Sequence, residues 1–167
     1  MPMRSICLAA AAACLSLTIA SAAWAEGAWS FGHDKLRGSP QVELVQGGQA
    51  KFYLGCGHAV GLWIAYAGSA KIGDKATMTL SNGKRTLTYQ GEVAEGTPFE
   101  TKAPYFLVWD LGAPHGDPAL NPLLDALLDF MSAGAPITVS SGSASYVLPA
   151  PQIANLKGLF RQDCPGY

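Results

Sequence analysis

The stretch that decides the fold class is Lys75 to Tyr89, which reads KATMTLSNGKRTLTY. Asn82-Gly83 in its middle is the pair most typical of a two-residue type I′ hairpin turn. Such a turn pairs Ser81 with Lys84, and the strands then sort their side chains onto two faces. One face is apolar except for one arginine, and consists of Ala76, Met78, Leu80, Arg85, Leu87 and Tyr89. The other face carries hydroxyl and charged groups, so the sequence predicts an antiparallel hairpin that is buried on one side.

Segments on both sides of this hairpin also show strand patterns. Apolar and polar residues alternate, or nearly so, in Gln41 to Val45, Ala50 to Cys56, Val60 to Tyr66, Ile137 to Ser140 and Ala144 to Leu148. The last two flank Ser141-Gly142-Ser143 and predict a second hairpin. Pro104 to Leu111 (PYFLVWDL) is apolar on both faces, which predicts a central strand covered on both sides.

Two segments predict helices. Asn121-Pro122 is typical of a helix start, with Asn as N-cap and Pro in the first turn. The apolar residues that follow, Leu124, Leu127, Leu128 and Met131, share one helical face, and Gly134 marks the end. A second helix is expected from about Pro151 to Asp163. We therefore expect an α+β fold, with an antiparallel sheet or sandwich of about seven or eight strands, two helices and one disulfide.

Residues 1–25 have the form of a signal peptide. Arg4 precedes an apolar run from Ile6 to Ala20, and Ala23-Trp24-Ala25 is a small-x-small cleavage site. An uncleaved anchor and a lipoprotein signal ending before Cys14 are the alternatives. The Ala-rich run is weakly apolar for a membrane span, and no Leu stands three positions before Cys14. We expect residues 26–167 to form a single secreted or periplasmic β-rich domain, with no membrane span after cleavage.

Cys56 and Cys164 are the two cysteines that remain once the leader is removed. Two thiols in an oxidising compartment are expected to pair, and Cys56 falls on the core face of its strand. A redox pair and half of a metal site are the alternatives. The CxxC spacing of a redox pair is missing, and His58 beside Cys56 has no second pair to complete a metal site. We predict a structural disulfide, and no cofactor or metal.

Composition and charge exclude other classes of protein. Eleven Lys and Arg against twelve Asp and Glu give a formal charge of −1, so no positive field favours nucleic-acid binding. Hydrophobic residues make up 49% and charged residues 14%, which is enough apolar mass to form a core rather than a disordered chain.

The residues best suited to chemistry are Asp110, His115 and Asp117, in or beside the Gly- and Pro-rich segment Gly112 to Pro118. They suit a small hydrolase or a metal-dependent enzyme, but Asp and His are also ordinary turn residues in such a segment. The same segment is the candidate inhibitory loop of an inhibitor of a secreted hydrolase such as lysozyme. We favour the turn interpretation and a protein that is not an enzyme, and the alternatives stay open.

Tyr53 and Trp63 are predicted to lie on the strand face opposite Phe52 and Leu62. With Lys51 they are candidates for a surface that binds a partner protein or a glycan. The competing interpretation is that a helix packs over this face. We favour packing, because the helix after Asn121 must lie against part of the sheet.

The order of cysteine and apolar positions resembles that of small proteobacterial periplasmic proteins, the type VI secretion-associated VasI proteins. The similar segments are Lys51 to Cys56, Leu124 to Val139, Tyr146 to Leu148 and Leu156 to Cys164. The resemblance implies a non-catalytic accessory domain and transfers no binding residue. We therefore expect a non-enzymatic accessory or binding protein of the cell envelope, whose partner is an envelope protein or a glycan.

Overall fold

The computed structural model describes residues 27–33, 38–57, 59–96, 101–109, 111 and 121–164. The predicted leader lies outside these residues, and so do Asp110, His115 and Asp117. Within them the chain forms nine strands and two helices. In chain order these are β1 (Ala28–His33), β2 (Pro40–Gln46), β3 (Gln49–Cys56), β4 (Val60–Ala65), β5 (Lys75–Ser81), β6 (Thr86–Gly96), β7 (Thr101–Val108), α1 (Asn121–Met131), β8 (Ile137–Ser141), β9 (Ala144–Leu148) and α2 (Leu156–Asp163).

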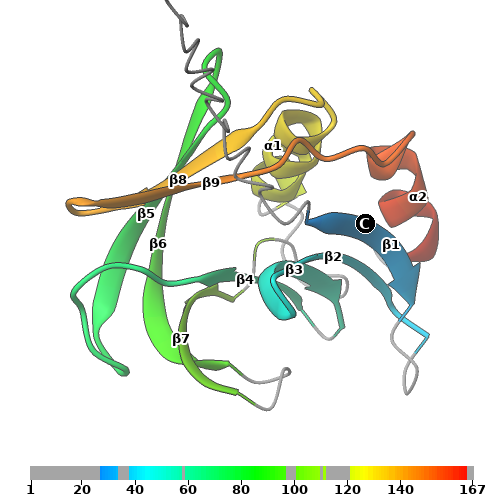
Figure 1. Ribbon diagram of the computed structural model, residues 1–167. Coiled ribbons are helices and arrows are strands. Elements are labelled where there is room, and N and C mark those ends of the chain that lie inside the picture. The colour runs from blue at the N-terminus through cyan, green and yellow to red at the C-terminus, as the bar shows by residue number, and fades with distance from the viewer. Residues whose placement is uncertain are drawn as a thin grey trace, which may run out of the picture.

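All nine strands belong to one curved antiparallel sheet (Figure 1), in the order β1-β2-β3-β4-β7-β6-β5-β8-β9. The predicted α+β class is confirmed, as a single sheet with one strand more than expected. The additional strand is β1, which pairs along its whole length with β2. The curvature brings the two edge strands towards each other. The indole N–H of Trp29 in β1 donates to the carbonyl of Pro149, just after β9, at 2.9 Å.

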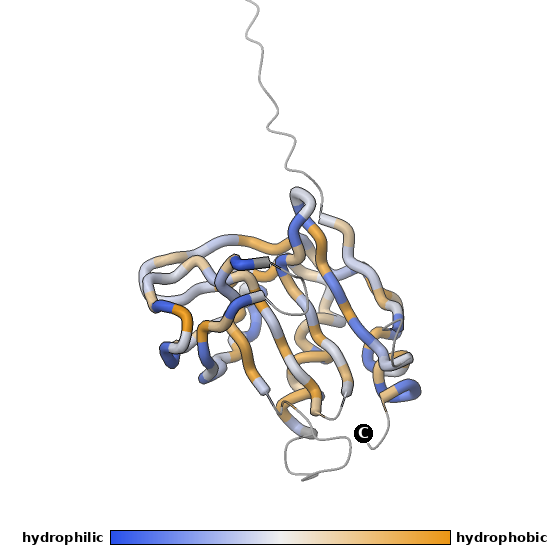
Figure 2. Tube along the Cα trace, turned by 90° about the horizontal axis from the view of Figure 1, so that it is seen from below, coloured by the Kyte–Doolittle hydropathy of each residue, from blue (hydrophilic) through white to orange (hydrophobic). Residues whose placement is uncertain are grey.

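The hydrophobic core lies on the inner face of this sheet. Phe52, Leu62 and Phe106 point from the central strands into the same buried cluster as Leu124 and Phe160 of the two helices. Figure 2 shows hydrophobic stretches along the strands and hydrophilic residues in many of the connecting turns. The prediction that Pro104 to Leu111 is covered on both faces holds for Tyr105, Phe106 and Leu107, which are buried, but not for Trp109, which is exposed.

Helix α1 begins at Asn121 and buries its whole predicted stripe of Leu124, Leu127, Leu128 and Met131. Gly134 follows with a φ of 63°, and its N–H donates to the carbonyl of Met131, which ends the helix as predicted. The second helix starts later than expected, at Leu156 and not near Pro151. The reason is Asn155, whose φ of 51° is left-handed and cannot continue a right-handed helix.

The central hairpin keeps its predicted faces but not its predicted register. Ser81 pairs with Thr86 and Met78 with Tyr89, so the pairing is shifted by two residues. A type I′ turn needs a positive φ at both central residues. Gly83 has a positive φ. Asn82 does not, because Asn155 is the only non-glycine residue with a positive φ in the described part of the chain. Asn82 instead closes a four-residue loop, because its side-chain oxygen accepts the N–H groups of Lys84 and Arg85.

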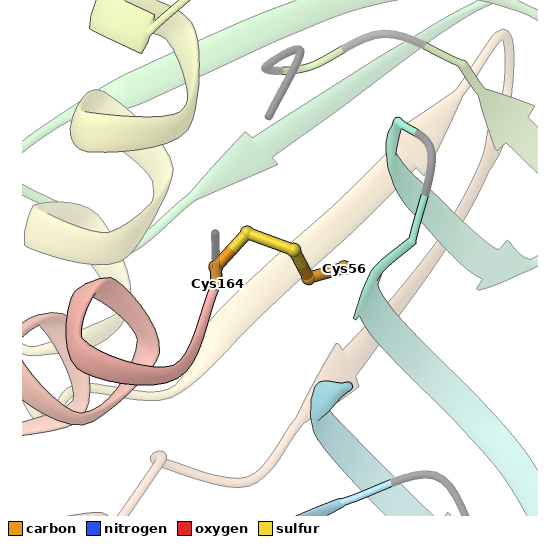
Figure 3. The surroundings of a disulfide bond; sticks show 2 residues. All are labelled: Cys56 and Cys164. Atoms are coloured by element: carbon orange, nitrogen blue, oxygen red, sulfur yellow. A yellow bond between two sulfur atoms is a disulfide. The ribbon is translucent and has the colours of Figure 1, made fainter. Parts of the chain in front are cut away.

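The predicted disulfide between Cys56 and Cys164 is confirmed. It joins the end of β3 to the residue after α2 (Figure 3). Next to it, His33 at the end of β1 lies 2.8 Å from a carboxylate oxygen of Asp163. The C-terminal helix is therefore tied to two strands of the sheet, once covalently and once through a polar contact.

Candidate functional site: the aromatic outer face

The aromatic side chains of the central strands gather on the outer face of the sheet, opposite the helices. We call this surface the aromatic face and define it by Tyr53, Trp63, Tyr105, Leu107 and Trp109. Trp63, Tyr105 and Leu107 form a cluster separate from the main core, and Tyr53 packs against it. The buried residues of α1 belong to the main core with Phe52 and Leu54. The expectation that this helix packs over Tyr53 and Trp63 is therefore wrong, because α1 lies against the opposite face.

Strand register places these residues in a row across the sheet. Tyr53 of β3 is paired with Trp63 of β4, and Trp63 is paired with Leu107 of β7. The row continues on one side to Glu43 of β2 and on the other to Glu92 of β6. Since directly opposed side chains lie on the same face, one line of the sheet presents aromatic rings flanked by carboxylates.

Two glycines make room for the rings. A Cβ atom at Gly55 would clash with the ring of Tyr53, and a Cβ atom at Gly61 would clash with the ring of Trp63. Both rings therefore occupy the space beside a glycine two residues away along their own strands. The hydroxyl of Tyr53 also donates to the side-chain oxygen of Gln41 at 3.3 Å. These contacts hold the two rings in fixed orientations.

Trp109 completes the aromatic face and is its most exposed member. Its ring centroid lies 5.0 Å from that of Trp63 with an interplanar angle of 81°, and Tyr53 meets Trp63 at 5.4 Å and 77°. Both are edge-to-face contacts, the arrangement that aromatic quadrupoles favour. Trp63 is only 9% exposed, whereas Trp109 is 55% exposed. Trp109 thus offers a large apolar surface to solvent on a rigid aromatic base.

The same face carries a pocket next to the aromatic row. Its volume is about 350 Å³, and its lining is Glu43, Val45, Gly48, Gln49, Ala50, Ala103 and Tyr105. A register shift between Leu44 and Val45 brings Ala50 opposite Val45, where it points to the outer face. Tyr105 is paired with the small Ala65, and its hydroxyl reaches across to the carbonyl of Ala50 at 2.7 Å. The bulge and this hydrogen bond shape the pocket.

The other half of the outer face is chemically different. On β5, β6 and β8 the outward residues are hydroxylic or polar, and several bond to one another. Thr77 donates to Gln90 at 2.9 Å, and Ser140 to Ser145 at 3.2 Å. Val147 of β9, 52% exposed, is a large apolar residue on this half. The aromatic face is thus a distinct region of the outer surface.

Asp110, His115 and Asp117, the predicted candidates for enzymatic or metal chemistry, lie outside the described residues. In the described part of the chain, no three His, Cys, Asp or Glu residues are grouped as metal ligands would be. Neither α1 nor α2, the helices of the described part, has the length and hydropathy that a membrane span requires.

Comparison of the chain with protein-family models, with curated proteins and with solved structures finds no significant match.

Sequence reasoning identified Tyr53 and Trp63 but missed Tyr105, Trp109 and Glu43. The sequence does contain a signal for Tyr105 and Trp109, because Tyr105, Leu107 and Trp109 alternate within the segment predicted to be buried on both faces. Assigning them to the outer face required the pairing of β7 with β4, which joins strands separated by β5 and β6 in the chain. Placing Glu43 beside Tyr53 required the register of β2 against β3.

Proposed function

We propose that this protein is a non-enzymatic accessory binding protein of the cell envelope, and that it holds its partner on the aromatic face. The observation that carries the proposal is Trp109, more than half exposed and braced edge-on by Trp63. Exposed aromatic residues on a rigid support are typical of the centres of protein interfaces, because they bury much area and lose little conformational entropy.

Two further observations support an interaction site on this face. The aromatic row is flanked by Glu43 and Glu92, and an apolar centre with a polar rim is the usual composition of an interface. The opposite face of the sheet is already filled by the core and the helices. The aromatic face therefore provides the apolar contact area and the hydrogen-bonding groups that a partner protein or glycan would need.

The proposed location, periplasmic or secreted, rests on the leader pattern and on the disulfide. Cystines persist in oxidising compartments and are rare in the cytosol. An accessory role of the kind that the VasI resemblance implies fits a small exported domain with one binding face.

The test compares capture of a partner by three forms of the oxidised protein. Immobilised wild type, Trp109→Ala and Val147→Ala are exposed to envelope extract of the source organism, and bound proteins are quantified by mass spectrometry. Val147→Ala is the matched control, because Val147 is equally exposed but lies on the hydroxylic half. We expect a partner that wild type and the control retain and that Trp109→Ala loses about tenfold, the size of an aromatic hot spot. Equal recovery by all three forms would refute the proposal.

A second arm of the test distinguishes the two classes of partner. Co-sedimentation with purified cell-wall sacculi reports glycan binding in the absence of envelope proteins. We expect the protein to stay in the supernatant, since the neighbouring carboxylates suit a protein partner. Sedimentation that Trp109→Ala abolishes would assign the aromatic face to a glycan.

A further inference from the structure

The pocket beside the aromatic face contains a carboxylate that has no partner among the described residues. Glu43 is half-buried, and it forms no hydrogen bond or ion pair within the described ranges. A carboxylate that loses part of its hydration shell without gaining a partner is unfavourable. Binding of a cation in the pocket would relieve that penalty.

Lys51 is the cation closest in the sequence, and it bonds to Gln49 at the pocket but forms no ion pair with Glu43. Its ammonium group donates to the side-chain oxygen of Gln49 at 3.0 Å. Glu92, the other carboxylate of the same row, lies 3.2 Å from the ammonium of Lys75 and so has a counter-ion. Of the two carboxylates that flank the aromatic row, Glu92 thus has a cationic partner, and Glu43 has none among the described residues.

The remaining walls of the pocket suit a flat or elongated cation. Tyr105, itself buried, closes one side of the pocket and is held in place by its bond to the carbonyl of Ala50, and Val45 and Ala103 provide apolar contacts. Burial, and in addition the charge of Glu43, raise the pKa of the Tyr105 hydroxyl, which places that carboxylate close enough to influence the pocket. The planar guanidinium group can form two parallel hydrogen bonds to a carboxylate, and its alkyl stem can lie against apolar side chains.

We propose that this pocket binds the side chain of an arginine, or less strongly of a lysine, from the protein partner, with Glu43 as its counter-ion. The inference rests on the proposed function, since the basic residue enters the pocket while neighbouring residues of the partner cover Trp63 and Trp109. The pocket volume of about 350 Å³ lies in the range of sites for small ligands, and is ample for one side chain.

The probe is n-butylguanidinium, which reproduces the end of an arginine side chain, titrated into the ¹⁵N-labelled oxidised protein. n-Butanol is the neutral control ligand. Glu43→Gln removes the proposed counter-ion, and Glu92→Gln is the matched control, because it removes the paired carboxylate of the same row. We expect saturable shifts of the amides of Gly48, Gln49 and Ala50 in wild type and in Glu92→Gln. Glu43→Gln should weaken the binding about fivefold or more.

Equal affinity in Glu43→Gln and wild type would overturn the inference, and so would equal shifts with n-butanol. Shifts confined to the surroundings of Glu92 would also overturn it. Failure here is distinct from failure of the proposed function, which is tested by partner capture. A partner lost by Trp109→Ala but kept by Glu43→Gln leaves the binding face intact and removes the arginine pocket. A partner lost by both variants, together with weaker butylguanidinium binding in Glu43→Gln, supports both the binding face and the arginine pocket.

Discussion

Removal of the Cys56–Cys164 disulfide should cost the protein much of its stability. The two residues are 108 apart in the sequence, and the chain-entropy relation gives about 4.8 kcal/mol for a closed loop of that length. Small domains have a total free energy of unfolding of roughly 5–15 kcal/mol. Both cysteine side chains are buried, so alanines in their place would also lose some packing. The double substitution Cys56→Ala/Cys164→Ala should therefore destabilise the fold by at least a third.

The assay is urea unfolding at 25 °C, followed by tryptophan fluorescence, for the oxidised wild type and the double variant. With a slope of about 1–3 kcal/mol per molar urea, the midpoint should fall by about 1.6–4.8 M. Wild type in reductant is the control, because it removes the bond but keeps both sulfurs. Hydrogen exchange adds a local measurement, in which the amides of α2 should lose the most protection in the variant.

A change in unfolding free energy below about 1 kcal/mol would contradict this prediction, since the long loop would then contribute almost nothing. Two reactive thiols in the denatured, unreduced protein would refute it more directly, because the bond itself would be absent.

Three further predictions follow from packing and charge. Leu128→Ala should lower the free energy of unfolding by about 2–5 kcal/mol. Leu123→Ala, on the exposed side of the same helix, should lower it by less than about 1 kcal/mol. Equal falls of the urea midpoint in the two variants would contradict the assignment of Leu128 to the core. Asp125→Asn removes the ion pairs of a partly exposed carboxylate with Arg161 at 3.0 Å and Lys157 at 3.1 Å, so the free energy of unfolding should fall by about 1 kcal/mol, and by less in 1 M NaCl. Burial, and secondarily Tyr105, raise the pKa of Tyr146 above its ordinary value of 10.0, so the folded state holds this proton more tightly than the unfolded state. The resulting stability is complete below pH 10 and is lost as the pH rises above it, so midpoints measured from pH 8 to pH 11 should fall less steeply in Tyr146→Phe than in wild type.

Much of the fold was predictable because local sequence and tertiary structure agree. The apolar stripe of α1 and its cap residues predict the same helix that packing produces. The hairpin around Asn82-Gly83 shows the limit of local rules. Its two faces were predicted correctly, since a shift of two residues preserves the alternation, but its register depended on where Asn82 directs its side-chain oxygen.

The binding face was harder to predict, because it depends on which strands become neighbours. Tyr53 and Trp63 lie in a local hairpin, so their common face could be read from alternation. Trp109 and Leu107 reach them only through the pairing of β4 with β7, across an excursion that contains all of β5 and β6. The side chosen by α1 could not be read from periodicity either, because both faces of β3 and β4 offer large apolar residues.

The position of the cystine has a mechanical consequence. If the protein is stretched between its two ends, tension passes from β1 through β2 and β3 to Cys56, and then crosses the S–S bond to Cys164. Residues 57–163, which include both helices and the six strands from β4 to β9, lie outside that covalent path. Under force the first three strands can be peeled away, whereas residues 57–163 cannot be extended between the two ends until a reductant opens the bond.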